Sequence, residues 1–385
     1  MDINIFEQWS LADQILMAAA VVVFGIQLYY YLYYFNSILR YRRKQDEGIV
    51  PFLETQPPVS VIICARNEYR HLQRFLPSIL TQDYPQYEVI VINDGSTDAT
   101  EDLLHELSKQ YSNLYCSFVP ASANVRSTKK LGLTIGIKAA KYDLLLFTDA
   151  DCKPAYKQWI SHMARNFTHG TEFVIGYGGY KKAKGLVSRL ISYDTLFIGL
   201  QSLGFALTGK PFMGVGRNMA YRKETFIREK GFSKSLNLQS GDDDLFVNGI
   251  ANEYNTRVEI SPESVTWSLP KDSFNAWFRQ KERHLSTAKF YTFSSLMLLG
   301  MELFSRAMFY LLVVAILIFS SLPLKIAVMV LFVFRYGVQL RTINKVAKQW
   351  NERRFYFLIL FFDLFLPLVN LYIHLFRKKT IYHWK

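Results

Sequence analysis

The stretch YDLLLFTDADCKP, residues 142–154, places two aspartates directly after an apolar run. The apolar run has the length and composition of a buried β-strand. Asp149 and Asp151 repel each other unless a cation lies between them or water screens them. Mg²⁺ and Mn²⁺ take carboxylate oxygens as ligands, often together with substrate phosphates. A solvated turn is the plain alternative, but the position after a buried strand favours a metal-phosphate site.

This strand is the fourth in a series in which strands alternate with helices. The earlier strand patterns lie at residues 59–65, 87–94 and 114–119, and the helical patterns between them at residues 72–82, 99–111 and 129–141. The alternation predicts an α/β domain with a mostly parallel sheet that is covered by helices on both faces.

Polar residues follow these strands, with Glu68 after the first and Asp94 after the second. Because such sheets bind ligands beyond the carboxyl ends of their strands, we expect both residues to lie at the same edge as Asp149 and Asp151. For Asp94, within NDGSTD, a role in a turn is as well supported as a contact with a nucleotide. No strand precedes a G-x-G-x-x-G motif, which disfavours a dinucleotide-binding enzyme.

A second acidic motif lies in SGDDDLFVNGI, residues 240–250, at the start of a predicted helix. One acid is explained by the helix N-terminus, which favours negative charge. Three consecutive acids, Asp242, Asp243 and Asp244, exceed that need. One of them can therefore act as a general base.

The stretch WFRQKERHLSTAKF, residues 277–290, mixes aromatic and basic residues in a predicted helix. Two interpretations are equally supported by the spacing. The helix can lie at the membrane surface with its basic side chains at lipid headgroups. Alternatively, Gln280, Arg283 and His284 share one helical face and contact a substrate.

Four apolar runs, at residues 15–35, 295–319, 322–340 and 355–376, are long enough to cross a membrane. Charged residues inside the runs, among them Glu302, Arg306 and Arg335, are expected to face protein or an interface. The last run also contains Asp363 and precedes a basic tail, so a re-entrant hairpin and a span packed against protein both stay open.

The orientation follows from the charges beside the first run. Acidic residues precede it and basic residues follow it, at Asp2, Glu7 and Asp13 and at Arg40, Arg42, Arg43 and Lys44 respectively. The positive-inside rule then predicts an external N-terminus and a cytoplasmic central domain. An acidic leading region and the lack of a cleavage site disfavour a signal peptide.

Composition agrees with this arrangement. Half of the residues are hydrophobic and the net charge is +13, which suits an acidic membrane surface, a phosphate-bearing substrate or nucleic acid. The three cysteines lack metal-ligand spacing, so we expect reduced thiols.

Together the motifs resemble those of family 2 glycosyltransferases, the membrane-embedded inverting enzymes with a GT-A fold. That group includes hyaluronan, cellulose and poly-N-acetylglucosamine synthases and ceramide glucosyltransferases. The resemblance covers residues 59–284 and lies in the order and spacing of the motifs and their membrane flanks. QKERH at residues 280–284 matches the Q-x-x-R-W motif with His284 in place of Trp, and residues 214–224 resemble the acceptor-side segment more loosely.

The resemblance implies a role for each matched residue. Asp94 would contact the nucleotide, and Lys129, or else Lys130, would lie near the diphosphate. Asp149 and Asp151 would bind the metal and the sugar nucleotide, with Asp151 the direct metal ligand and Asp149 nearer the sugar or ribose. Asp243, the second acid of its pair, would be the catalytic base, with Asp244 as the alternative. The further substrate-binding residues would be Glu68, Gln280, Arg283 and His284.

These observations predict an integral membrane protein of a bacterial inner membrane that uses Mg²⁺ or Mn²⁺. The predicted partners are a UDP- or GDP-linked sugar donor, a lipid or glycan acceptor and membrane lipids, but no nucleic acid. The predicted segments are an anchor at 1–44, a linker at 45–58, the GT-A domain at 59–271, an interfacial helix at 272–294 and a membrane region at 295–385. Polysaccharide synthesis, a single transfer to a lipid and a non-catalytic nucleotide-sugar-binding protein remain alternatives.

Overall fold

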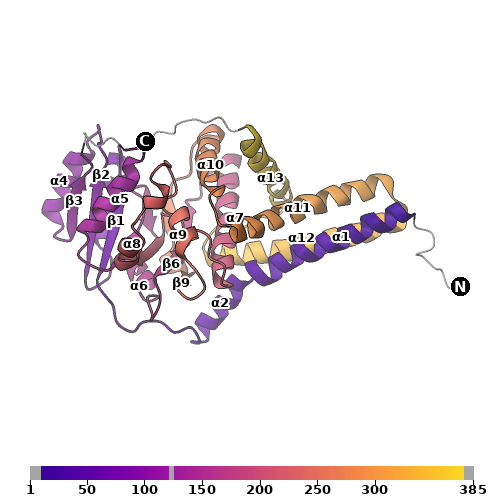
Figure 1. The fold of residues 1–385 in the computed structure, drawn as a ribbon, viewed down its shortest axis with the longest axis horizontal. Coiled ribbons are helices and arrows are strands. Elements are labelled where there is room, and N and C mark those ends of the chain that lie inside the picture. The colour runs from indigo at the N-terminus through magenta and orange to yellow at the C-terminus, as the bar shows by residue number, and fades with distance from the viewer. Residues whose placement is uncertain (1–9, 121–124, 377–385) are drawn as a thin grey trace.

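The computed structural model describes residues 10–120 and 125–376. An α/β domain and a bundle of long helices lie side by side along the longest axis of the molecule (Figure 1). Asp2, Glu7 and the basic residues after 376, which entered the orientation argument, lie outside the described residues.

The core of the α/β domain is a seven-stranded sheet in the order β3-β2-β1-β4-β8-β6-β9. The strands are β1 (Val59–Ala65), β2 (Tyr87–Asn93), β3 (Leu114–Phe118), β4 (Leu144–Phe147), β6 (Phe173–Gly176), β8 (Met219–Arg222) and β9 (Thr256–Glu259). The first four strands pair in parallel, whereas β8 runs antiparallel to both β4 and β6. The predicted mostly parallel α/β sheet is confirmed.

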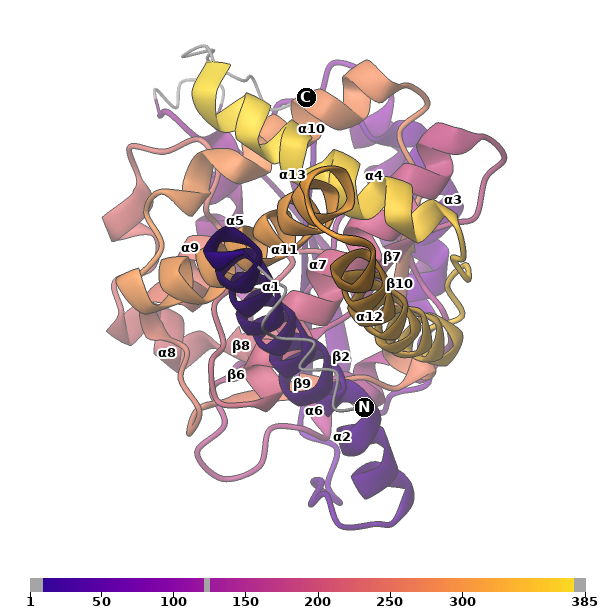
Figure 2. The same cartoon turned by 90° about the vertical axis from the view of Figure 1, so that its right-hand side faces the viewer.

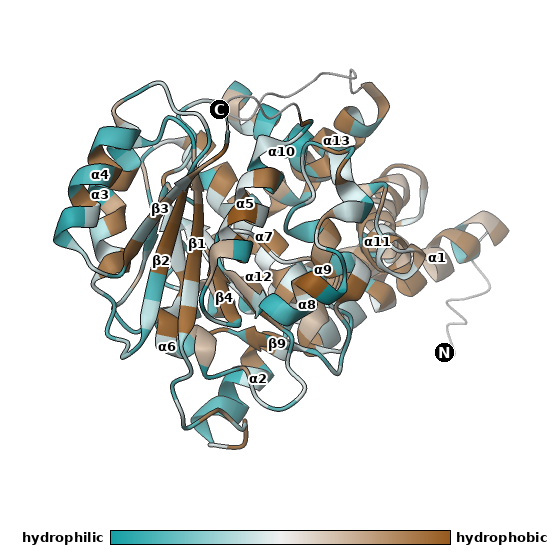
Figure 3. Cartoon of the chain, turned by 60° about the vertical axis from the view of Figure 1, so that its left-hand side comes forward, coloured by the Kyte–Doolittle hydropathy of each residue, from teal (hydrophilic) through white to brown (hydrophobic). Residues whose placement is uncertain are grey.

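The two faces of β1 pack against different helices because successive side chains of a strand point to opposite faces. Val61 and Ile63 pack with α3 (Tyr69–Leu80) and α4 (Thr100–Gln110), while Ile62 and Cys64 pack with α5 (Thr128–Ala139). Figure 3 shows α3 and α4 on one side of the strands and α5 on the other.

A glycine lets α5 approach the sheet closely. A Cβ atom at Gly136 would lie 2.5 Å from Cδ1 of Ile92 on β2, which is closer than two carbon atoms can pack. The glycines of this stretch argue against a helix by propensity alone. Close packing explains their presence in one.

A second, three-stranded sheet continues from the DAD sequence. It joins β5 (Cys152–Pro154), β10 (Thr266–Ser268) and β7 (Gly178–Tyr180) in that order. Strand β5 begins one residue after Asp151. The remaining helices of the α/β domain are α6 (Trp159–Ala164), α7 (Leu186–Leu207), α8 (Lys223–Arg228), α9 (Asp244–Ile250) and α10 (Phe274–Ala288).

Within the described residues, five helices are long and apolar enough to cross a membrane. The predicted apolar runs account for α1 (Leu11–Tyr29), which continues through a π-helical turn into α2 (Ser37–Asp46), for α11 (Phe293–Phe319), α12 (Leu322–Gln349) and α13 (Leu358–Phe376). The fifth is α7, which the sequence analysis did not include. Its most apolar window is 78% buried, so it packs as a core helix between the sheet and the bundle.

The helices α1, α11 and α12 run side by side away from the sheet (Figure 1). The start of α1 and the connection between α11 and α12 lie at the end of the bundle away from the α/β domain (Figure 1). The external N-terminus and the cytoplasmic central domain stay predictions. Figure 2 views these helices foreshortened, whereas α13 runs across the view and contacts α7, α10 and α11. This arrangement favours a last segment that is packed against protein.

The bundle is also tied to the sheet domain by the connection between α12 and α13. The indole of Trp350 stacks on the Tyr177 ring with 4.1 Å between centroids, and the Tyr177 hydroxyl donates to Glu352 Oε1 at 2.8 Å. Tyr177 lies between β6 and β7, so the membrane helices contact the same sheet edge that carries the small three-stranded sheet.

The charged residues of the apolar runs face protein, as predicted. Asp363 on α13 is fully buried and accepts hydrogen bonds from Arg306 at 3.0 Å, Arg335 at 3.0 Å and Tyr310 at 2.8 Å. Glu302 pairs with Arg306 at 3.2 Å. Two carboxylates and two guanidinium groups therefore balance one another inside the bundle.

We expect Asp363→Asn to lower the melting temperature of the detergent-solubilised protein, because the two buried arginines would then share a single carboxylate. Breaking a buried ion pair costs about 3–5 kcal/mol. The control is Asp46→Asn, which removes an exposed pair with Arg42 and should change little. Equal melting temperatures for the two variants would contradict this account of the cluster.

Candidate functional site

Residues from three separate motifs line one pocket at the carboxyl ends of β1 and β4. Lys129 comes from the start of α5, Asp149 follows β4, and Asp242 and Asp243 precede α9. Apolar side chains form the rest of the wall, and Ile62, Cys64, Leu133, Phe147, Met219 and Tyr221 are among them. The structure thus brings the two acidic motifs together across almost a hundred residues of sequence.

Lys129 joins the two acidic motifs. Its ammonium lies 2.8 Å from Asp242 Oδ2 and 3.8 Å from Asp149 Oδ1. Burial by itself lowers the pKa of Lys129, but the carboxylates of Asp242 and Asp149 outweigh it and raise that pKa. Burial would raise the pKa of Asp242, yet Lys129 holds it below its ordinary value. The pair is therefore ionised at neutral pH.

Asp243 differs from its two acidic neighbours because it is partly exposed whereas they are buried. It is the N-cap of α9, and its carboxylate accepts from the backbone N–H of Asp244 and of Gly216, both at 2.9 Å. Burial, followed by the charges of Asp242 and Asp244, raises the pKa of Asp243 to about 7. A carboxylate with this pKa suits general base catalysis near neutral pH.

Asp244 points into the protein instead. Its carboxylate accepts hydrogen bonds from the hydroxyls of Thr287 and, at 2.8 Å, Tyr291, both at the end of α10 and just beyond it. These contacts tie α9 to α10. They favour Asp243 over Asp244 as the base, because Asp244 does not line the pocket.

Lys130 likewise has a different environment from its neighbour Lys129. Its side chain is buried, and its ammonium donates to the carbonyls of Ser235, Leu238 and Ser240 at 2.5–3.0 Å. Burial lowers the pKa of Lys130 to about 8. Lys130 therefore anchors the loop that leads to the three acids, while Lys129 faces the pocket.

We expect Lys130→Met to lower the melting temperature by several degrees, because three buried carbonyls would lose their donor and each unsatisfied group costs about 1–3 kcal/mol. Differential scanning fluorimetry of the purified protein would measure the change. Lys138→Met, at an exposed position of the same helix, is the matched control. A loss no larger than that of the control would show that Lys130 does not anchor the loop.

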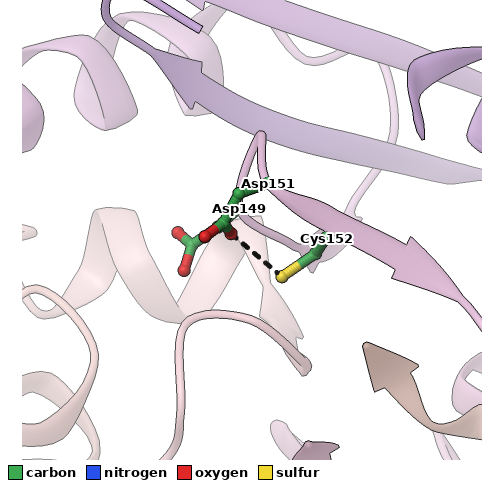
Figure 4. Close-up of side chains that lie close together, drawn as sticks. All are labelled: Asp149, Asp151 and Cys152. Atoms are coloured by element: carbon green, nitrogen blue, oxygen red, sulfur yellow. Dashed lines mark hydrogen bonds between the residues drawn. The ribbon is translucent and has the colours of Figure 1, made fainter. Parts of the chain in front are cut away.

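Asp149 and Asp151 lie side by side on the loop between β4 and β5 (Figure 4). With Cys152 they form a group whose possible ligand atoms all lie within 4.8 Å of one another. Asp151 accepts from Ser268 Oγ at 2.8 Å, and the Cys152 thiol donates to it at 3.4 Å.

The donor set fits a hard divalent cation such as Mg²⁺ or Mn²⁺, which prefers oxygen ligands. Burial raises the pKa of the Cys152 thiol far above its ordinary value, so the thiol stays protonated and is a poor ligand. Burial, and after it the charge of Asp151, also raises the pKa of Asp149, although Lys129 opposes the shift. A cation would relieve that repulsion.

The remaining predicted residues lie around the pocket without lining it. Asp94 is buried after β2, and its carboxylate accepts from Thr128 Oγ1 at 2.6 Å, next to Lys129. Glu68 follows β1 at the same edge, and its carboxylate contacts the ring of His71. For both residues, a contact with the nucleotide stays a prediction.

Helix α10 presents different faces to the protein and to solvent. Lys281 is buried and pairs with Asp194 of α7 at 2.7 Å, which holds the helix against the α/β domain. Gln280 donates to the Tyr180 hydroxyl at 2.9 Å, while Arg283 is partly and His284 more fully exposed. Desolvation by the surrounding protein, followed by the charges of Arg283 and Arg217, lowers the pKa of the His284 imidazole well below its ordinary value. This placement supports a substrate-facing role over a purely interfacial one.

Sequence reasoning missed three residues of this neighbourhood. Ser268 binds Asp151, Tyr180 binds Gln280, and Arg217 lies over the Tyr180 ring with 4.4 Å between its Cζ atom and the centroid. Ser268 and Tyr180 belong to short strands without a motif. Arg217 lay in the loosely matched segment at 214–224, which was the available signal.

Two family models match this chain and together cover residues 60–373. The model of the family described as glycosyl transferase family group 2 matches residues 161–373, more than half of the chain, and that of glycosyl transferase family 2 matches residues 60–228. The chain belongs to glycosyltransferase family 2. The predicted family is confirmed.

Two curated relatives illustrate the similarity. "Probable glycosyltransferase YdaM" of Bacillus subtilis is 24% identical over 272 residues, which cover 67% of this chain and 62% of that protein. "Poly-beta-1,6-N-acetyl-D-glucosamine synthase" of Staphylococcus aureus is 24% identical over 266 residues, 65% of this chain and 59% of that protein. The chain thus matches about three fifths of the length of these relatives.

A solved structure shares the fold. The mannosyltransferase PcManGT of Pyrobaculum calidifontis, determined in complex with GDP-Man and Mn²⁺, superposes with a TM-score of 0.58 at 17% identity. The alignment covers 94% of this chain and all of that one. This likeness confirms the predicted GT-A fold.

Proposed function

We propose that this family 2 glycosyltransferase moves a sugar from a nucleotide-sugar donor to a hydroxyl acceptor with inversion, at the cytoplasmic face of a membrane. The observation that carries the proposal is the pocket in which Asp243, with a pKa of about 7, faces Lys129 and Asp149. The solved PcManGT complex contains GDP-Man and Mn²⁺, which supports a nucleotide-sugar donor and a divalent cation for this chain as well.

The mechanism is a single displacement. The acceptor oxygen forms a bond to the anomeric carbon as the bond from that carbon to the diphosphate oxygen breaks. Asp243 takes the proton of the acceptor hydroxyl, and the donor leaves as a nucleoside diphosphate. Asp149 and Asp151 would hold a divalent cation, which when bound would supply Lewis-acid stabilisation to the leaving diphosphate.

Asp242 and Lys129 support this step without exchanging protons. Their ion pair at 2.8 Å keeps Asp242 negative, and that negative charge helps to raise the pKa of Asp243 toward neutrality. Lys129 also lies 3.8 Å from Asp149, so its charge acts on the side of the pocket where the leaving group would lie. An inverting transfer needs one base beside the acceptor hydroxyl and positive charge beside the leaving diphosphate. Asp243 would provide the first and Lys129 part of the second.

A screen of UDP- and GDP-sugars with Mn²⁺ or Mg²⁺, measuring nucleoside diphosphate release, tests the proposal. We expect release by the wild-type protein and a loss of about 10²–10⁴-fold in Asp243→Asn, because no other group would accept the proton. Asp102→Asn, at an exposed position on α4, is the control. Equal turnover by wild type and Asp243→Asn would remove Asp243 as the base, and no release with any donor would overturn the function.

The pKa of Asp243 also predicts a pH profile. Below pH 7 the carboxyl group is protonated and cannot accept a proton, so kcat/KM should rise about tenfold per pH unit and level off above pH 7. Initial rates between pH 5.5 and 8.5 would measure this limb (roughly the range in which the protein should stay folded). A flat profile in the wild-type protein would contradict the assignment.

The product separates two versions of the function. Relatives that are poly-β-1,6-N-acetyl-D-glucosamine synthases favour a polymer. The small number of membrane-crossing helices in the described residues favours a single transfer to a lipid acceptor. Gel separation of the labelled product distinguishes a ladder of chains from a single glycolipid.

A further inference from the structure

Arg217 lies on the segment between α7 and β8, two residues before β8 begins. The residue before it, Gly216, donates its N–H to Asp243 at 2.9 Å. The residue after it, Asn218, is fully buried and its side chain binds the carbonyls of Tyr177 and Ser264, both at 2.8 Å. The backbone of Arg217 is therefore fixed on both sides.

The Arg217 side chain is fixed as well. Its guanidinium lies over the Tyr180 ring, and the Tyr180 hydroxyl is in turn held by Gln280 at 2.9 Å. Nη1 of Arg217 is buried and has no hydrogen-bond partner within residues 10–120 and 125–376. A buried guanidinium N–H normally has an acceptor, so this group is oriented for one that the described residues do not supply.

The charges around Arg217 indicate which kind of hydrogen-bond acceptor its guanidinium would bind. Burial by itself lowers the pKa of Arg217, but its neighbours, Asp149 and Asp151 among them, outweigh burial and raise that pKa. A divalent cation bound to the two aspartates would cancel their negative charges. Lys129 is already matched by Asp242 at 2.8 Å. With the cation bound, Arg217 adds a positive charge beside the site, and the negative charge of a nucleoside diphosphate is suited to meet it.

We propose that Arg217 binds the donor's β-phosphate, the one attached to the sugar. The inference rests on the proposed function and extends it to a residue to which the family resemblance assigned no role. The planar guanidinium can bind two phosphate oxygens. It lies over Tyr180, which pairs across the small sheet with Ser268, the hydrogen-bond partner of Asp151, so it lies on the side where the diphosphate would sit. When the nucleoside diphosphate leaves, the same contact stabilises the added charge on the β-phosphate oxygen.

Calorimetry with UDP, GDP and the matching monophosphates, in Mn²⁺ and detergent, tests the inference. We expect Arg217→Gln to weaken diphosphate binding by about tenfold or more and monophosphate binding by less than about twofold, since a monophosphate lacks the β-phosphate. Arg217→Lys keeps the charge but loses the two-pronged contact, so an intermediate loss is expected. Arg189→Gln, at an exposed position on α7, removes the same charge and should bind like wild type.

The outcomes separate this inference from the proposed function. Wild-type affinity of Arg217→Gln for the diphosphate, or an equal loss for mono- and diphosphates, overturns the role of Arg217 while leaving the transferase intact. Failure of the wild-type protein to bind either diphosphate overturns both. If Arg217→Gln does not purify as a monodisperse protein, Arg217→Lys decides alone, and wild-type binding by that variant overturns the two-pronged contact.

Discussion

The ammonium of Lys129 lies between two carboxylates that come from distant parts of the chain. Asp149, Asp151, Asp242 and Asp243 all approach one sheet edge, and four like charges would repel one another without a cation among them. Lys129 neutralises Asp242 and reaches toward Asp149. This leaves Asp243 as the acid whose pKa is near neutrality. The ion pair with Lys129 therefore gives Asp242 and Asp243, two chemically identical groups, different tendencies to bind a proton.

Adjacent residues take different roles because a helix start turns successive side chains by about 100°. Lys129 faces the pocket and Lys130 anchors the loop before the acids. In the same way, Asp243 faces the pocket and Asp244 binds α10 through Thr287 and Tyr291. Through these two pairs, the candidate chemistry and the packing that holds it are built from the same short motifs.

Two sets of contacts hold the membrane helices together and against the sheet domain. The buried cluster around Asp363 fixes α13 across the base of the bundle. The stacking of Trp350 on Tyr177 fixes the connection between α12 and α13 to the sheet domain. Helix α10, held by the ion pair of Lys281 with Asp194, then presents Gln280 toward Tyr180 and Arg217. The candidate site is therefore completed by α10, the last helix of the α/β domain before the membrane helices.

The sequence alone determined the family, the α/β class, the apolar runs and the motifs that meet at the sheet edge, because strand and helix periodicity and residue order are local properties. The resemblance favoured Lys129 over Lys130 and Asp243 over Asp244 without a physical reason for either choice, and the sequence did not find Tyr180 and Ser268 or assign a role to Arg217. Those choices depend on which side chain faces which neighbour after strands from distant segments pair. Only the tertiary structure sets the distances, and with them the burial and the charges, that give each residue its chemistry.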